Sequence, residues 1–300
     1  MYEGAFRILR ALGDGRPRSV NALVRDAGEA TSVVLDTLRR YPKWFDEEDG
    51  QVRCTQSGFA AFGREAAARA QPSSSGRPAW LAEYETIAAE RGEPKRELDQ
   101  VYVTTDTAVR RAETLLAAGE HQRGLVFLGD DDLTSAAVQL AGAGRKISVL
   151  DTDEDVLAIL ARHAEQRGWE PEGIRHDLRE PIPRELRGRF GAVFTDPPYA
   201  IEGFVLFVSR AIEMLKPDGR LYVSFGQSRR AGERGLQKQR ALADAGLLIE
   251  AVFEDFNAYR GAEAIGSRSA LWRCRRTPET KPLVRGAVDG PLYTSRPPND

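Results

Sequence analysis

The most specific chemical pattern in the chain is Asp196-Pro197-Pro198-Tyr199, which follows the short apolar run from Ala192 to Thr195. Two consecutive prolines lack backbone N–H donors and stiffen the turn, so the Asp196 carboxylate and nearby carbonyls remain as acceptors directed at one point. Such acceptors can orient an amine and stabilise the positive charge that develops as it attacks an electrophilic carbon. The ring of Tyr199 can pack against a cation. We therefore predict Asp196 and Tyr199 as catalytic residues and Pro197 as part of the binding site.

A second pattern is the acidic loop Gly129-Asp130-Asp131-Asp132, which follows the run Leu125 to Leu128. Glycine at the end of a strand allows a ligand to approach the backbone closely. One aspartate is expected where a helix begins, as its cap, but three are not. Three adjacent carboxylates would repel a phosphate and attract a sulfonium or ammonium group. We predict that Gly129, Asp130 and Asp132 bind such a co-substrate and that Asp131 takes part in catalysis.

Two further strand candidates end in acidic residues. Asp151-Thr152-Asp153 follows Ile147 to Leu150, and Asp177 follows Ile174 to His176. An acidic residue after the second strand of a nucleotide-binding sheet can accept hydrogen bonds from both ribose hydroxyls of an adenosine. Asp153 can instead cap the helix that begins at Glu154, so Asp151 is the stronger ribose candidate. Asp177 is predicted to receive the adenine amino group.

The elements that must position these residues alternate from about residue 100 onward between short β-branched runs and helical stretches. This alternation is typical of a doubly wound α/β domain with a mostly parallel sheet covered by helices. Ligands of such sheets bind at the carboxyl ends of the strands, where the acidic residues would meet. The strand candidates cover residues 124–128, 146–150, 174–176, 192–194, 220–225, 248–253 and 270–273.

The first 70 residues differ from the rest. Three stretches have helical spacing of apolar residues, Ser19 and Thr31 can cap the second and third, and two strand candidates meet at Glu48-Asp49-Gly50. We predict a winged-helix domain over 1–70. The Ser-, Pro- and Gly-rich run from Gln71 to Pro78 predicts a linker over 71–96. A catalytic domain over 97–285 and a flexible tail over 286–300 complete the expected organisation.

Arg39, Arg40 and Lys43 near the third helix are candidate contacts to nucleic-acid phosphates. Acidic residues are interleaved with them, however, including Asp36 one turn away, and phosphate binding favours an uninterrupted basic face. We therefore expect an interaction or dimerisation module within a homodimer rather than a nucleic-acid-binding module.

The overall composition excludes several classes. A net charge of -2, from 43 basic and 45 acidic side chains, gives no general attraction to nucleic acid or to an anionic membrane. Cys54 and Cys274 are far apart without partners at metal-ligand spacing, so neither a disulfide framework nor a metal site is predicted. No run of about 18 apolar residues occurs, as a membrane span would need. We expect a soluble, cytoplasmic protein that contacts no membrane.

Taken together, these motifs resemble the class I S-adenosylmethionine-dependent transferases. More narrowly, the chain is similar to the branched-chain polyamine synthases through five segments, although it lacks the paired cysteines of archaeal members and has Ala200 where they continue with Thr. The resemblance implies transfer of an aminopropyl group from decarboxylated S-adenosylmethionine to the polyamine spermidine, with release of methylthioadenosine. It also implies that the Asp130–Asp132 loop and Asp196 hold ammonium groups. The segments are Glu97 to Gln100, Thr104 with Thr107 to Arg111, Gly129 to Ser135, Asp196 to Tyr199 and Phe256 to Tyr259.

Three alternatives remain open. The chain is also similar to isonocardicin synthase, which moves a 3-amino-3-carboxypropyl group from intact S-adenosylmethionine to a phenolic oxygen in antibiotic biosynthesis. That donor carries a carboxylate, which needs a cation or backbone N–H groups, and Arg260 is the candidate partner.

An N-methyltransferase would share the Asp-Pro-Pro-Tyr motif, and one acting on nucleic acid would need a basic groove, but residues 201–204 carry no basic side chain. A winged-helix regulator that senses a ligand is the non-enzymatic alternative.

Overall fold

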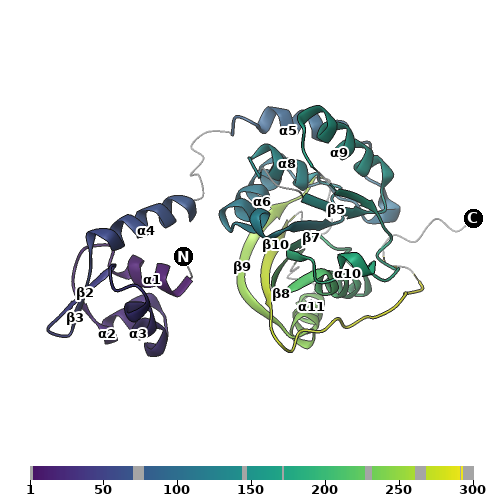
Figure 1. Ribbon diagram of the computed structural model, residues 1–300. Helices are drawn as coiled ribbons and strands as arrows, with labels where there is room; N and C mark the ends of the chain where they lie inside the picture. Colours follow the sequence, from purple (N-terminus) through teal and green to yellow (C-terminus); the bar gives the residue numbers. More distant parts are fainter. Residues whose placement is uncertain are drawn as a thin grey trace, which may run out of the picture. The chain divides into compact units, whose positions relative to one another are not determined.

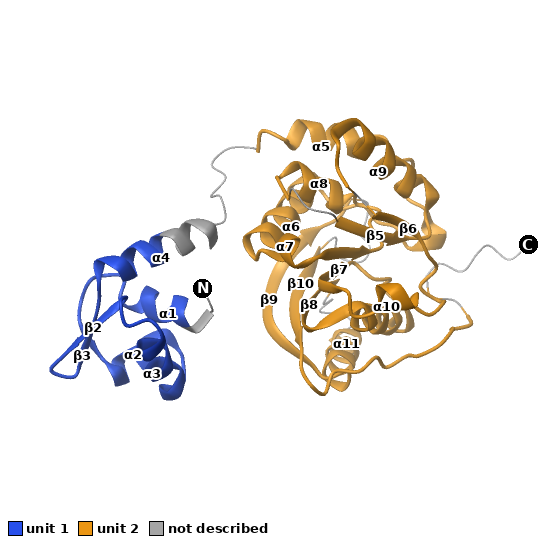
Figure 2. Cartoon of the chain, in the orientation of Figure 1, with its two compact units in different colours: residues 1–73 blue, residues 74–300 orange. Residues whose placement is uncertain are grey.

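The computed structural model of the chain describes residues 3–69, 78–143, 147–170, 172–226, 232–260, 268–290 and 292 (Figure 1). The chain divides into two compact units, Met1–Ser73 and Ser74–Asp300 (Figure 2). None of the helices in the described ranges has both the length and the apolar content that a membrane span requires.

The first unit contains four helices and a small antiparallel sheet of order β1-β3-β2. The side chain of Ser19 accepts a hydrogen bond from the Ala22 N–H and so caps α2, whereas α3 begins after Ala30 without a side-chain cap. Asp49 and Gly50 both have positive φ in the turn between β2 and β3, as a two-residue hairpin requires. The elements are α1 (Glu3–Ala11), β1 (Arg18–Ser19), α2 (Val20–Ala27), α3 (Thr31–Arg40), β2 (Phe45–Glu48), β3 (Gln51–Cys54) and α4 (Gln56–Arg69).

This order contains the three helices and the hairpin that the sequence predicts, with β1 and α4 in addition. Apolar side chains from α1, α2, α3 and the hairpin form one buried cluster, in which Leu9, Leu23 and Val34 are fully buried. The assignment of this unit as a winged helix stays a prediction.

The second unit is an α/β domain. Its elements are α5 (Leu81–Ala88), η1 (Arg96–Leu98), α6 (Thr105–Ala117), α7 (Glu120–Arg123), β4 (Leu125–Leu128), α8 (Thr134–Leu140), β5 (Ile147–Asp151), α9 (Glu154–Arg167), β6 (Glu172–Arg175), η2 (Arg184–Leu186), β7 (Phe190–Thr195), α10 (Ile201–Met214), β8 (Leu215–Phe225), α11 (Gly232–Asp244), β9 (Leu247–Ala258) and β10 (Arg268–Arg276).

These strands form one seven-stranded sheet of order β6-β5-β4-β7-β8-β10-β9. Strands β4 to β8 pair in parallel, and β10 pairs antiparallel with both β8 and β9. The predicted mostly parallel, doubly wound sheet is therefore confirmed. After β4 the chain builds outward through β5 and β6, and it then returns to add β7 on the other side of β4. Open sheets of this kind bind ligands at such a reversal, beyond the carboxyl ends of the two strands.

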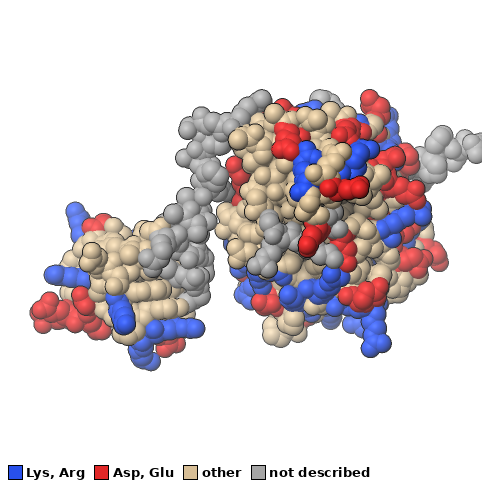
Figure 3. Space-filling view, turned by 45° about the horizontal axis from the view of Figure 1, so that its top comes forward, with Lys and Arg blue, Asp and Glu red and all other residues tan. Residues whose placement is uncertain are grey.

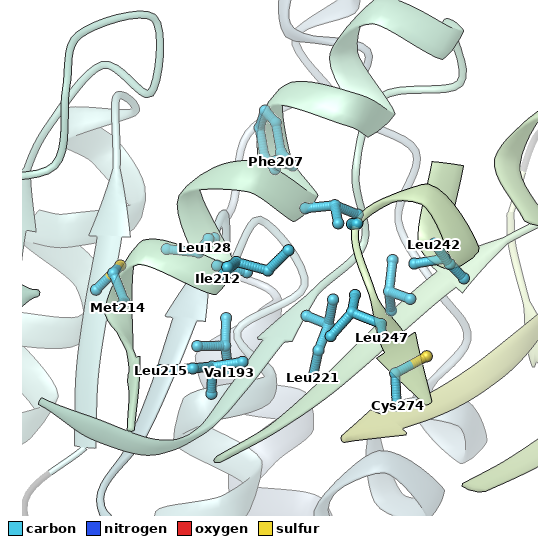
Figure 4. Close-up of a cluster of buried hydrophobic side chains, with 14 of the residues drawn as sticks. Leu128, Val193, Phe207, Ile212, Met214, Leu215, Leu221, Leu242, Leu247 and Cys274 are labelled. Atoms are coloured by element: carbon cyan, nitrogen blue, oxygen red, sulfur yellow. The ribbon is translucent and has the colours of Figure 1, made fainter. Parts of the chain in front are cut away.

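Helices cover both faces of the sheet (Figure 1). Successive residues of a strand point to opposite faces, so Val126 and Leu128 of β4 join one buried cluster while Leu125 and Phe127 join another. Helices α10 and α11 pack on the first face, where Phe207, Ile212 and Leu242 lie among the labelled side chains of Figure 4. Helices α6, α8 and α9 cover the second face. Burial on both faces explains why the central strands read as continuous apolar runs.

Two predicted boundaries need correction. The segment predicted as a linker, 71–96, contains α5, whose residues Leu81, Tyr84 and Ile87 are buried against the second unit. The helical spacing of these three side chains was the missed signal. The segment predicted as a flexible tail, 286–300, also makes contacts in its described part, because Val288 N–H donates to the Arg179 carbonyl and Leu292 is only 4% exposed. Residues 291 and 293–300 of that prediction lie outside the described residues.

Candidate active site

A cleft of about 630 Å³ lies where the loops after the parallel strands meet. Of the residues predicted for the site, Gly129, Asp131, Asp151, Asp177, Asp196 and Pro197 line this cleft, whereas Asp130, Asp132, Asp153 and Tyr199 do not. The remaining lining residues are Leu98, Asp99, Gln100, Leu150, Thr152, His176, Leu178, Pro198, Phe207 and Leu292.

Asp151 is held at the end of β5 by two backbone groups. The Asp130 N–H donates to one carboxylate oxygen and the Asp153 N–H to the other, each at 2.9 Å. Burial raises the pKa of Asp151. Both oxygens keep acceptor capacity toward the cleft, because a carboxylate oxygen can accept more than one hydrogen bond. This geometry suits a pair of vicinal hydroxyl donors.

Asp153 has the capping role that the sequence left open. Its side chain accepts the Asp155 N–H and caps α9. Its oxygens also accept Lys95 Nζ at 2.6 Å and Gln100 Nε2 at 2.8 Å. Although burial opposes it, these hydrogen bonds lower the pKa of Asp153. Asp153 therefore positions Gln100, which does line the cleft, and does not face the cleft itself.

The three adjacent aspartates point in different directions. The carboxylate of Asp130 turns inward and accepts the N–H and the hydroxyl of Ser135 in the first turn of α8. Burial raises its pKa to about 8, although the bonds from Ser135 oppose that shift. The carboxylate of Asp132 accepts the Val103 N–H at 2.7 Å and Arg111 Nη1 at 2.8 Å. Asp130 and Asp132 are each 3% exposed and shape the loop from behind.

Asp131 is the member of the triplet that faces the cleft. Its carbonyl accepts Arg91 Nη1, but no hydrogen bond or ion pair to its carboxylate occurs within the described part of the chain. Burial raises its pKa well above the ordinary value, and the nearby carboxylates of Asp132, Asp196 and Asp151 raise it further. A carboxylate in this state gains most from a bound cation, because the cation offsets both the burial and the repulsion.

Asp196 is braced on one side only. Its Oδ2 atom accepts hydrogen bonds from Arg111 Nη2 and from the Tyr259 hydroxyl, the latter at 2.8 Å. No bond to its Oδ1 atom occurs within the described ranges. Asp196 lines the cleft. The brace therefore fixes the carboxylate plane and leaves one oxygen for a ligand donor.

Tyr199 contacts cations of the protein itself. Lys238 Nζ lies 4.7 Å from the centre of its ring, and the guanidinium of Arg234 lies 5.5 Å away. Lys238 is 3% exposed and also lies near the rings of Phe204 and Phe225. Burial lowers the pKa of Lys238 to about 8. Tyr199 thus packs on cations of the protein and lies outside the cleft lining, and its predicted contact with the reacting cationic centre stays a prediction.

The cleft lining also includes apolar side chains and a few further polar groups. Leu98, Leu150, Leu178, Phe207 and Leu292 contribute the apolar surface. Asp177 pairs with Arg179 Nη2 at 2.5 Å, and although burial opposes it, this pairing lowers the pKa of Asp177. His176 Nε2 is buried without a hydrogen-bond partner among the described residues. An apolar wall with an unsatisfied ring nitrogen fits a nucleobase.

The sequence did not assign three residues of this site. Arg111 and Asn257 lie behind the carboxylates, joined by a bond from Arg111 Nε to Asn257 Oδ1 at 2.8 Å, and Tyr259 contacts Asp196. All three lie in segments noted for their resemblance to a family, but no local pattern marks them. They come from α6, from β9 and from just beyond β9, and only the fold brings them to β7.

Comparison with known proteins agrees with this geometry. A polyamine synthase of Thermococcus kodakarensis, N(4)-bis(aminopropyl)spermidine synthase, is 37% identical over 186 residues, which cover 60% of this chain and 52% of the relative. The chain spans about half the length of the curated relatives it matches. A putative RNA methyltransferase of Pyrococcus horikoshii shares the fold at a TM-score of 0.52 and 13% identity, over 67% of this chain and 100% of that one.

A solved structure covers nearly the whole chain. The branched-chain polyamine synthase of Thermus thermophilus, in complex with N4-aminopropylspermidine and 5'-methylthioadenosine, superposes with a TM-score of 0.64 at 25% identity. The match covers 97% of this chain and 91% of that one. The family described as the branched-chain polyamine synthase A C-terminal domain matches residues 80–281, which contain every residue of the cleft except Leu292. The chain therefore belongs to the branched-chain polyamine synthase A C-terminal domain family.

Proposed function

We propose that this chain transfers an aminopropyl group from decarboxylated S-adenosylmethionine to a nitrogen of a polyamine. The acceptor nitrogen uses its lone pair to form a bond to the terminal carbon of the three-carbon arm. The bond between that carbon and sulfur breaks, and its electron pair stays on sulfur, which leaves as neutral methylthioadenosine. The positive charge passes from sulfur to nitrogen, and a secondary amine becomes a tertiary ammonium.

The observation that carries this proposal is the charge of the cleft. Five aspartates line it, and no lysine or arginine is among its described lining residues. A cationic donor fits such a lining, and so does a polyamine that carries ammonium groups away from its reacting nitrogen. The carboxylate of intact S-adenosylmethionine would lie there without a counter-cation, at a cost of roughly several kcal/mol if it were buried. Arg260, the candidate partner for that carboxylate, is exposed and donates to Thr105 instead.

Two carboxylates are suited to the reacting atoms. The Asp131 carboxylate has no hydrogen-bond or ion-pair partner within the described chain, and Asp131 faces the cleft. It can therefore stabilise the positive charge on sulfur before the transfer and on nitrogen after it. Asp196 offers Oδ1 to an N–H of the acceptor and so orients the lone pair. We assign catalytic roles to these two residues and a supporting role to Tyr199.

The donor's nucleoside matches the part of the cleft that includes Asp151 and Gly129. Asp151 would accept the ribose hydroxyls, and Gly129 allows the loop to approach the donor, since its φ of +70° is easy only for glycine. Asp177 or His176 would contact the adenine edge, with Leu150 and Leu178 against its faces. No step of this arrangement requires a metal ion.

The comparisons support the same assignment. The Thermus thermophilus relative is described with an aminopropylated polyamine and methylthioadenosine bound, which are the two products expected of this reaction. The relatives named N(4)-bis(aminopropyl)spermidine synthase are 33 to 37% identical over 174 to 186 residues.

The test offers decarboxylated and intact S-adenosylmethionine side by side, with spermidine or a phenol as the acceptor, and identifies the products by mass spectrometry. We expect an aminopropyl adduct with the decarboxylated donor and none with the intact donor. A 3-amino-3-carboxypropyl adduct on a phenol, or a methyl adduct, would replace this proposal by one of the alternatives. Binding of the donor without any adduct across a panel of amines would favour a ligand sensor.

We also propose that residues 1–73 form a winged-helix module that serves contacts between two copies of the chain. The order of helices followed by an antiparallel hairpin supports the module. Acidic and basic side chains are interspersed on the faces seen in Figure 3, and Arg39 pairs with Asp36 at 3.4 Å, which does not favour a phosphate-binding face. Light scattering of the full chain and of residues 74–300 tests the dimer, because loss of the dimer on truncation is expected.

A further inference from the structure

Two arginines, Arg111 and Arg210, are the largest fully buried side chains among the described residues, and Arg111 lies behind the cleft. Arg111, on α6, is 1% exposed and donates to three residues from separate parts of the fold. Its Nη1 bonds Asp132 at 2.8 Å, its Nε bonds Asn257 at 2.8 Å, and its Nη2 bonds Asp196. Burial works against the guanidinium charge, but Asp196 and Asp132 outweigh it and raise its pKa.

Arg111 changes the charge that the reacting atoms experience. Asp131, Asp132, Asp151 and Asp196 can each carry one negative charge, and Asp131 interacts electrostatically with the other three. Three positive charges oppose them. They belong to Arg111, to Arg91, whose Nη1 lies 3.6 Å from Asp132, and to Lys238, which interacts electrostatically with Asp196. One negative charge therefore remains. The sulfonium of the donor brings one positive charge, which leaves no surplus to attract a protonated acceptor nitrogen.

We propose that Arg111 is a positioning residue that sets this balance, so that the acceptor nitrogen binds without its proton and keeps its lone pair for attack. The inference rests on the proposed function. Without Arg111 the surplus negative charge would favour the ammonium form of the acceptor, which binds well but cannot attack. The brace on Asp196 Oδ2 would be lost at the same time.

The remaining groups around Arg111 do not replace its charge. Tyr259 shares Asp196 Oδ2 with it, and burial raises the pKa of that phenol well above the ordinary value, so the phenol stays neutral. Lys238 on α11 interacts electrostatically with Asp196 but makes no hydrogen bond to it within the described residues. The ring of Phe194 on β7 lies 5.1 Å from the guanidinium carbon and carries no charge. The charged and titratable groups that interact with Arg111 or with the carboxylates of Asp131 and Asp196 include Arg91, Asp131, Asp132, Asp151, Asp196, Lys238 and Tyr259.

The experiment compares Arg111→Gln, which keeps an N–H donor but no charge, with Arg111→Lys, which keeps the charge. The pH profile of kcat, which reports groups in the complex with bound acceptor, is measured with the full chain at saturating donor and acceptor. Arg111→Gln should move the acid-side midpoint upward by roughly one unit or more, since one nearby charge shifts a pKa by about that amount. Below the midpoint kcat should fall roughly tenfold per unit while KM stays equal or decreases. Arg111→Lys should keep the midpoint of the unaltered chain.

Two further variants test whether Arg111 acts through its charge, even if Arg111→Gln folds poorly. Asp132→Asn removes one negative charge and should move the midpoint downward, and Arg111→Gln with Asp132→Asn should restore it. Arg220→Met is the control, because Arg220 lies among buried Glu120 and Glu250 at the other end of β8 and lines no part of the cleft. It should cost stability and leave the midpoint unchanged.

Equal midpoints in Arg111→Gln and Arg111→Lys, or a double variant no closer to the unaltered chain than Arg111→Gln, would overturn the role of Arg111. Failure of the unaltered chain to form an aminopropyl adduct would instead refute the proposed function, and the role of Arg111 with it.

Discussion

Replacing Lys238 by methionine should stabilise the second unit at neutral pH. Burial lowers the pKa of this lysine from 10.5 to about 8, so the folded chain carries an ammonium that the unfolded chain hydrates better. Below pH 8 both states are protonated and the full cost is present. Between the two pKa values the unfolded state binds more protons, so stability rises with pH. A difference of about 2.5 units corresponds to about 3 kcal/mol, which should fall to about 1 kcal/mol at pH 10.

The measurement is the free energy of unfolding of the full chain and of Lys238→Met, by urea denaturation at pH 7 and pH 10. Methionine suits the site because it fills similar volume among the rings of Tyr199, Phe204 and Phe225. Lys216→Met, at an exposed position, is the control for removal of a lysine. A variant that is less stable than the unaltered chain at pH 7, or a difference that does not shrink at pH 10, would show that the ammonium is not penalised there.

Other consequences can be tested directly. Asp196→Asn should keep the fold and the affinity for donor but lower kcat by roughly a hundredfold or more, and normal turnover would refute its role. Asp131→Asn should lower kcat by a similar factor, and an effect on acceptor KM alone would limit Asp131 to binding. Asp151→Ala should weaken calorimetric binding of methylthioadenosine by roughly tenfold, whereas unchanged affinity would rule out the ribose contact. Gel-shift assays at modest salt should show no tight duplex binding by the full chain, and nanomolar, sequence-dependent retention would favour the regulator.

The parallel sheet and its ligand edge were predictable because strands buried on both faces are read directly as apolar runs. Asp151 and Asp196 follow such runs immediately, and a side chain in that position can hardly avoid the edge of the sheet. Gly129 likewise follows the apolar run of β4 directly. The positions of the strand ends in the sequence therefore predict the cleft without any information on helix packing.

The direction of individual side chains within a loop was not predictable. Asp130, Asp131 and Asp132 are identical in type, but one bonds Ser135, one faces the cleft and one pairs with Arg111. The partners lie on α8 and α6, at separations that no local pattern encodes. Helix α5, inside the segment predicted as a linker, was missed for a different reason, since it has few turns and its stability comes from burial rather than from its own propensity.

The position of the last strand has a consequence for biosynthesis. Strand β10 inserts between β8 and β9, and Asn257 bonds both Ser224 and Ser269 across that insertion. The partners of Arg111 and Asp196 from β9 are thus fixed only once β10 is in place. A chain that ends before β10 lacks Ser269 and with it the bonds that this residue makes to Asn257 and Tyr259. Full support of the candidate site therefore depends on the last strand to be synthesised.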